Sequence, residues 1–102
     1  MAKVFALYGK PKDPAGFDRY YHDVHVPIAK RLPGLRAYEV TRGDISTPAG
    51  AATTHLVAVL TFDSIAAVKA ALASPEGQAT VADLAHFATG GVEVLIADTG
   101  AA

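Results

Sequence analysis

The sequence predicts one α+β domain over residues 1–102 with the element order βαββαβ, from its length and from the spacing of its apolar residues. A chain of 102 residues has room for a single core. The runs typical of strands are Lys3–Tyr8, Leu35–Val40, His55–Phe62 and Val92–Asp98. The runs with helical spacing are Pro14–Leu32 and Ile65–Phe87, the second of which restarts at Ser74-Pro75-Glu76. This order usually closes as a ferredoxin-like sandwich, an antiparallel sheet with helices on one face.

Turn and cap residues mark where these elements begin and end. Asp13 is a good helix N-cap, and Pro14 suits the first helical position because its φ angle is already helical. Pro33-Gly34 ends the first helical region. The stretch Thr41–Thr54 is rich in Gly, Ala, Pro and Thr and is predicted to be a loop. The signals at the second helical region are Asp63 or Ser64 at its start and Gly90-Gly91 at its end.

A proline lies inside the first helical region, close to a histidine. Pro27 removes a helical donor and crowds the preceding turn, and it disfavours helical geometry at Val26. We therefore expect a kink or break beside His25. Departures of this kind from local rules tend to occur at functional or strained places.

The strands are apolar on both faces, which is unusual for an antiparallel sheet with one wet face. His55–Phe62 and Val92–Ala97 carry apolar side chains at almost every position. Two helical regions can cover only one face of the sheet. A second copy of the chain, placed sheet against sheet, would bury the other face, so the sequence predicts a homodimer.

Composition and missing motifs exclude several classes of protein. The 9 basic and 10 acidic residues are dispersed, so neither nucleic acid nor an anionic membrane is an expected partner. There is no cysteine, which excludes disulfides, thiolate metal sites and cysteine nucleophiles. No apolar run approaches the roughly 18 residues of a membrane span, and no signal-length apolar core is present, so we expect a cytoplasmic protein. Nucleotide, dinucleotide, zincin and hydrolase-elbow motifs are absent, and we expect no cofactor.

Several short motifs resemble those of EthD-type proteins. They are residues 7–14, Phe17, Tyr20-Tyr21, residues 25–29, residues 32–35, Phe62-Asp63-Ser64, residues 74–79, Ala82-Asp83-Leu84 and Phe87-Ala88-Thr89. The resemblance covers nearly the whole chain apart from the loop around residues 47–52. It implies a dimeric α+β barrel, in which two ferredoxin-like sheets face each other and the helices lie outside.

The resemblance also implies a range of activities. The EthD family is named for a component associated with bacterial degradation of ethyl tert-butyl ether and is loosely assigned to oxidoreductases. Its superfamily includes cofactor-independent monooxygenases, muconolactone isomerases and polyketide cyclases. His25 matches the recurrent His-x-Pro of the family. One position departs from the pattern, because members often have an acidic residue in the middle of the third strand, where this chain has Val59.

His25 is the candidate catalytic residue. Helical spacing places it just beside an apolar stripe formed by Phe17, Tyr21, Val24 and Ile28, so it should point obliquely into the gap between helix and sheet. There a neutral imidazole can act as acid, base or hydrogen-bond donor. In the alternative interpretation, His25 bonds a carbonyl freed by the proline and only stabilises the kink.

Three tyrosines and a second histidine are candidate substrate-binding residues. Tyr8 and Tyr38, at the ends of neighbouring strands, can orient a ligand carbonyl or phenol through their hydroxyl groups, although such residues are also common at the edge of a core. Tyr21 lies on the apolar stripe. His55 opens the third strand. It is a candidate to approach the same cavity from the sheet side, although a strand-terminal histidine is more often a half-exposed cap. His86 has no recognisable partner and is expected on the surface.

Three residues of the first helix have a spacing that could bind a metal ion. Asp18, His22 and His25 fall at i, i+4 and i+7 on one side of the first helix, and such a trio could bind zinc or ferrous iron. However, Asp18 lies in the first helical turn, where any carboxylate is favoured, and His22 faces away from the apolar stripe. We therefore expect no metal.

Together these features predict a small enzyme that acts on a small, largely apolar or aromatic oxygenated compound of a degradative pathway. The reaction would be a cofactor-independent oxidation or a proton-transfer isomerisation or cyclisation, with His25 handling the proton. The alternative is a binding or accessory protein that sequesters a degradation intermediate without converting it.

Overall fold

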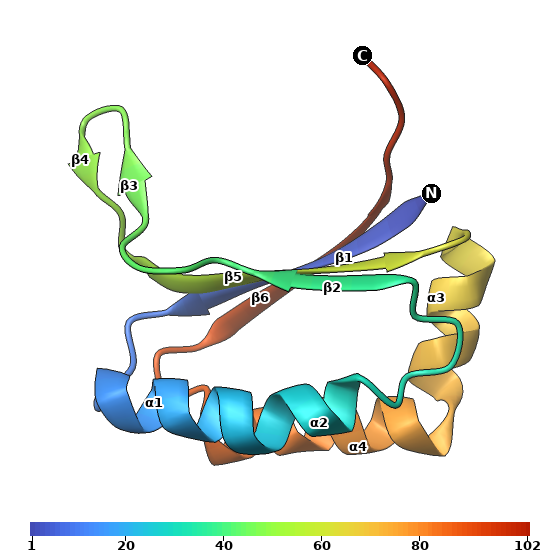
Figure 1. Cartoon of the computed structure of the whole chain (residues 1–102), viewed down its shortest axis with the longest axis horizontal. Helices are drawn as coiled ribbons and strands as arrows, with labels where there is room; N and C mark the ends of the chain where they lie inside the picture. The colour runs from blue at the N-terminus through green and yellow to red at the C-terminus, as the bar shows by residue number, and fades with distance from the viewer.

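The computed structural model describes all 102 residues and contains one four-stranded antiparallel sheet with helices on one side (Figure 1). The strands of the sheet are β1 (Ala2–Gly9), β2 (Ala37–Val40), β5 (Thr54–Phe62) and β6 (Val92–Asp98). Their order in space is β2-β5-β1-β6, with every neighbouring pair antiparallel. The predicted ferredoxin-like α+β fold is confirmed.

The helical layer is made of six short segments. They are α1 (Pro14–Tyr20), the π-helical η1 (Tyr21–His25), α2 (Val26–Ala29), α3 (Ile65–Ala73), α4 (Pro75–Asp83) and the 3-10 helix η2 (Leu84–His86). The caps act as predicted, since the side chains of Asp13 and Ser64 accept hydrogen bonds from the amides of Gly16 and Ala67. None of these helices has the length and apolar composition that a membrane-spanning helix requires.

The segment predicted to be a continuous loop contains a small hairpin. Strands β3 (Ser46–Thr47) and β4 (Gly50–Ala51) pair with each other and not with the main sheet. Thr47 stabilises the turn, because its hydroxyl group bonds the carbonyl of Gly50 and the amide of Ala49. In Figure 1 this hairpin and the C-terminal tail extend from the side of the sheet opposite the helices.

The core lies between the helices and one face of the sheet. The side chains of β1 that point toward the helices are Ala2, Val4, Ala6 and Tyr8, and all four are buried. The other face has no helix over it. There Phe5 pairs with Val59 on one side and with Leu95 on the other, which makes an apolar row across three strands. The expectation that the helices cover only one apolar face is therefore confirmed.

The proline is accommodated without the predicted break. Val26 keeps helical angles, with φ −57° and ψ −47°, so the expectation that it leaves helical geometry is wrong. Its amide donates to the carbonyl of Tyr21, five residues earlier, and this wider π turn makes room for the Pro27 ring. The chain thus runs through η1 into α2 as one helical rod (Figure 1).

Candidate functional site

An apolar cavity of about 70 Å³ lies between the helical layer and the sheet. His25 lines it from the helical side, together with Tyr21. Tyr8 and Tyr38 line it from strands β1 and β2. The structure thus brings His25 and the three candidate tyrosines together around one cavity. Nearly all other lining side chains are aliphatic, so these four residues supply most of its polar atoms.

His25 forms a buried pair with a carboxylate from another helix. Its Nδ1 atom lies 2.9 Å from Oδ2 of Asp83, the last residue of α4, and the two residues are 3% and 7% exposed. The second oxygen of Asp83 accepts a 2.7 Å hydrogen bond from the hydroxyl group of Tyr20. Since a carboxylate holds the Nδ1 proton, the ring is fixed as the tautomer whose Nε2 is a free base.

Burial keeps this histidine neutral. It lowers the pKa of His25 below the ordinary 6.5, and the neighbouring Asp83 opposes that change without cancelling it. No protein atom hydrogen-bonds Nε2, and this atom is not among the fully enclosed polar atoms without partners. The ring of Phe87 packs against the imidazole with centroids 4.7 Å apart. His25 therefore presents an unpaired basic nitrogen at the edge of an apolar cavity.

The π turn explains why His25 can reach Asp83. A π turn widens the helix by one residue and rotates the side chains that follow it relative to a regular α-helix. His25 is the last residue of η1, and it is buried although Val24 beside it is exposed. The π turn thus accommodates Pro27 and at the same time determines the direction of the imidazole.

The tyrosines form a second polar group in the cavity. The hydroxyl oxygens of Tyr21 and Tyr38 are 2.6 Å apart, and the ring of Tyr8 packs edge-on against Tyr21 with centroids 5.5 Å apart. Burial raises the pKa of all three phenols, and the nearby Tyr38 adds to this for Tyr8 and Tyr21. These hydroxyl groups are therefore neutral hydrogen-bond donors at neutral pH.

The cavity has an opening between a helix and the sheet edge. Val81 of α4 and Val94 of β6 both line the cavity, yet they are 54% and 47% exposed. Side chains that line the cavity and are also exposed to solvent mark the place where the cavity opens. An apolar ligand would enter there, beside the edge strand.

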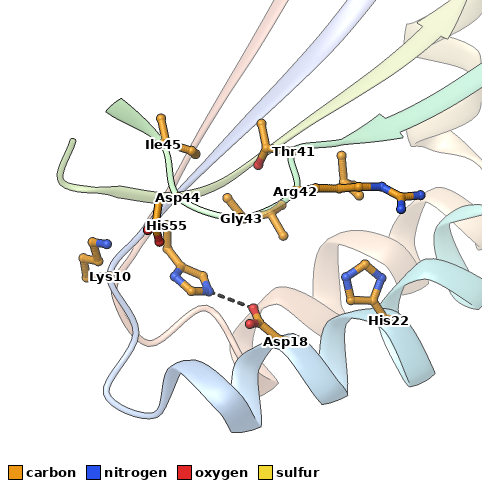
Figure 2. Close-up of a pocket in the computed structure, with 11 residues that line it drawn as sticks. Lys10, Asp18, His22, Thr41, Arg42, Gly43, Asp44, Ile45 and His55 are labelled. Atoms are coloured by element: carbon orange, nitrogen blue, oxygen red, sulfur yellow. Dashed lines mark hydrogen bonds and ion pairs between the residues drawn. The ribbon is translucent and has the colours of Figure 1, made fainter. Parts of the chain in front are cut away.

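His55 does not reach this cavity, so the prediction that it approaches His25 from the sheet side is wrong. Its Nε2 atom lies 2.8 Å from Oδ1 of Asp18 on α1, and the ring lines a separate, more polar pocket (Figure 2). His55 lies at the start of β5, and residues 41–45 line the same pocket beside it. His86 is exposed, as predicted.

The trio considered for a metal site is divided between two pairs. Asp18 faces His55, whereas His25 faces Asp83. No group of three or more His, Cys, Asp or Glu side chains is placed to hold a metal ion. The site consists of an imidazole, a carboxylate and phenols, which are groups that can accept and donate protons.

Asp83 is the site residue that the sequence analysis missed. The motif Ala82-Asp83-Leu84 carried part of the family resemblance, but no role was assigned to its carboxylate. Val59, by contrast, lies on the sheet face away from the helices, so its departure from the family pattern removes no acid from the His25 cavity.

Comparison with known proteins identifies the family. Residues 10–91 match the EthD domain. The chain belongs to the EthD family. A relative in Rhodococcus erythropolis, an uncharacterized 11.0 kDa protein in the thcB-thcC intergenic region, is 39% identical over 96% of this chain and 94% of its own length.

Solved structures agree with this assignment. An EthD family protein from Bacillus halodurans superposes on this EthD chain with a TM-score of 0.90 at 31% identity, covering 98% of this chain and 99% of that one. SnoaB, a cofactor-independent oxygenase from Streptomyces nogalater, has a TM-score of 0.65 at 17% identity, covering 99% of this chain and 93% of that one. At that identity the likeness to SnoaB concerns the fold alone.

Proposed function

We propose that this EthD protein is a small enzyme that binds a small, largely apolar oxygenated compound in the cavity and removes a proton from it with His25. The observation that carries the proposal is the His25–Asp83 pair, 2.9 Å long and buried, with Nε2 left unpaired. A general base must be neutral and oriented, and it must have a free lone pair. Burial keeps His25 neutral, and the hydrogen bond with Asp83 orients its ring. The unpaired Nε2 supplies the free lone pair.

The proton-transfer step follows from this arrangement. A C–H or O–H bond next to the ligand's oxygen function breaks, its proton moves to Nε2, and its electron pair stays on the ligand as an enolate or phenolate. The neutral hydroxyl groups of Tyr8 and of the Tyr21–Tyr38 pair are suited to donate hydrogen bonds to the developing negative charge. Asp83 stabilises the imidazolium that forms.

The step is common to both reaction classes expected from the sequence. In an isomerisation or cyclisation, the imidazolium returns its proton to a different atom of the product. In a cofactor-independent oxidation, the enolate or phenolate passes its electrons to dioxygen as the second substrate. The fold that the chain shares with SnoaB, a cofactor-independent oxygenase, supports the second class.

The cavity limits what can bind. At about 70 Å³ it is much smaller than the 300–1,000 Å³ typical of sites for drug-sized ligands. Its ligand is therefore small, or it extends through the opening between Val81 and Val94. A binding protein that sequesters such a compound is the second candidate, favoured by the nearly continuous apolar lining.

The uncovered sheet face supports a homodimer. The row of Val59, Phe5 and Leu95 is apolar, and no element of the same subunit covers it. Leu95 is 47% exposed, and together these side chains form the kind of patch that soluble proteins normally bury against a partner. The β3–β4 hairpin and the C-terminal tail extend from the same side of the sheet, where they would contact a second copy of the chain (Figure 1).

Proton NMR in deuterated water tests the proposed activity. The wild-type protein is mixed with single members of a set of small ketones, phenols and ether-derived carbonyl compounds. Binding is followed by shifts of the cavity methyl signals, and deprotonation by loss of the ligand's own C–H signal to deuterium. Binding together with exchange faster than in buffer is the expected result. Saturable binding of a member without accelerated exchange of its acidic C–H supports the sequestering protein instead.

A further inference from the structure

A second pocket lies at the other end of strand β2, outside the His25 cavity. It has a volume of about 510 Å³, and only 3 of its 11 lining residues are hydrophobic. Figure 2 shows that its side chains come from the helix that carries Asp18 and His22, from the loop of residues 41–45, and from the start of β5. Its size is within the range of small-molecule sites.

Two cations line this pocket without partners. Lys10 and Arg42 make no ion pair and no side-chain hydrogen bond, whereas Arg36 elsewhere on the surface is fully engaged by a bidentate pair with Asp63. In Figure 2 the Arg42 guanidinium and the His22 ring lie on one side of the pocket, and Lys10 lies on the other. The planar Arg42 group is well suited to a carboxylate, which it can bind through two parallel hydrogen bonds.

The acidic residues of the pocket neutralise the charge of Lys10 and Arg42 only in part. Asp18 is engaged by His55 at 2.8 Å, which leaves Asp44 as the one lining carboxylate without a hydrogen bond or ion pair. The hydroxyl group of Thr41 accepts a hydrogen bond from the amide of Val57 and keeps its own proton available to an acceptor. The unengaged groups are therefore mostly donors and cations.

The pocket also has an apolar portion, supplied by Val40, Ile45 and Leu56. We infer that it binds a small organic carboxylate, with the carboxylate held by Arg42 and the apolar part of the ligand against these three side chains. Asp18 and His55, which also line the pocket, are paired with each other at 2.8 Å. This site is separate from the His25 cavity and does not depend on the proposed proton transfer.

Titration of the ¹⁵N-labelled protein with benzoate, followed by amide chemical shifts, tests this inference. Benzamide is the matched neutral probe, because it keeps the ring and loses the charge. We expect benzoate to shift the amides of residues 40–45 and 54–57 saturably, with a millimolar dissociation constant, and benzamide to give no saturable shift there. Equal responses to the two probes, or no saturable response to benzoate, would overturn the inference.

Two variants test whether Arg42 is the residue that binds the carboxylate of benzoate. Arg42→Gln should weaken benzoate binding at least about tenfold, since a charge-assisted pair is lost, while Arg19→Gln, which changes an exposed arginine outside the pocket, should leave it unchanged. Arg42 is exposed and has no partner, so this variant should fold normally. Wild-type affinity in Arg42→Gln, or displacement of benzoate by an equal concentration of inorganic phosphate, would contradict a carboxylate site.

Discussion

The Nδ1 atom of His25 lies 2.9 Å from a carboxylate oxygen of Asp83, although 58 positions separate the two residues in the sequence. The contact joins the helical rod that contains Pro27 to the end of α4, and both partners are buried. A histidine close to a proline can have a purely structural role, such as a hydrogen bond that stabilises the helix. A buried histidine whose ring is held by a carboxylate and whose second nitrogen is free has the arrangement of a general base.

Asp83→Asn should reduce ligand-stimulated proton exchange by about 10²-fold, because the amide no longer favours the tautomer with a free Nε2. Tyr20→Phe is the matched control, since it removes the other hydrogen bond to Asp83 and leaves the imidazole contact intact. Exchange rates of both variants, measured by NMR in deuterated water, check this. Equal rates in Asp83→Asn and wild type would show that Asp83 does not orient the base.

Protonation of His25 should contribute to the loss of stability of the protein at acidic pH. Burial lowers the pKa of His25 in the folded state below the 6.5 of the unfolded chain, so the unfolded state binds the proton more tightly. The contribution to stability is then fully present above pH 6.5 and is lost as the pH falls through the folded-state pKa. Urea unfolding of the wild type and of His25→Gln across this range should show a smaller loss in the variant. A parallel pH dependence would contradict the lowered pKa.

Substitutions of two neighbouring residues of β6, which point to opposite faces of the sheet, should have different effects on assembly and on ligand binding. Leu95→Lys places a charge in the uncovered apolar row and should convert the dimer to a folded monomer in sedimentation experiments. Val94→Lys changes the opening of the cavity on the other face, so it should impair ligand binding and leave the assembly intact. A wild-type protein that sediments as a stable monomer would contradict the homodimer.

Tyr38→Phe should cost about 1 kcal/mol in the free energy of unfolding, because it removes the 2.6 Å hydrogen bond with Tyr21 inside the cavity. The ring remains, so packing should change little. Urea denaturation measures this change, and Tyr20→Phe, whose hydroxyl group donates to the Asp83 carboxylate, gives for comparison the cost of losing a charge-assisted hydrogen bond. A Tyr38→Phe variant as stable as wild type would show that the pair contributes nothing net.

Much of the fold could be predicted from the sequence because its signals are local. Apolar runs bounded by Gly and Pro gave the four main strands, and Val92–Asp98 matches to the residue. The hairpin in residues 46–51 was missed, because strands of two residues have no apolar pattern. The effect of Pro27 was predicted as a kink, since propensity rules describe the α-helix and not the π turn that absorbs the proline.

The candidate site could be predicted only in part, because its contacts are tertiary. Helical spacing places His25 beside the apolar stripe. The prediction that Tyr8 and Tyr38 lie on neighbouring strands is wrong, because β5 lies between β1 and β2, although both side chains line the cavity. Which carboxylate meets the imidazole depends on how α4 packs against the first helical rod, and no local pattern encodes that. For the same reason, the direction in which His55 points could not be determined before strand β5 and the loop above it were placed.

The most direct test of the proposed base is proton exchange in His25→Gln. The variant is mixed in deuterated water with a compound that binds the wild-type cavity and exchanges there. Glutamine can keep a hydrogen bond to Asp83, so the variant should fold, but its amide cannot accept a proton near neutral pH. We expect the ligand still to bind and its exchange to fall to the rate in buffer. A folded His25→Gln protein that exchanges the same ligand at the wild-type rate would contradict the assignment of His25 as the base.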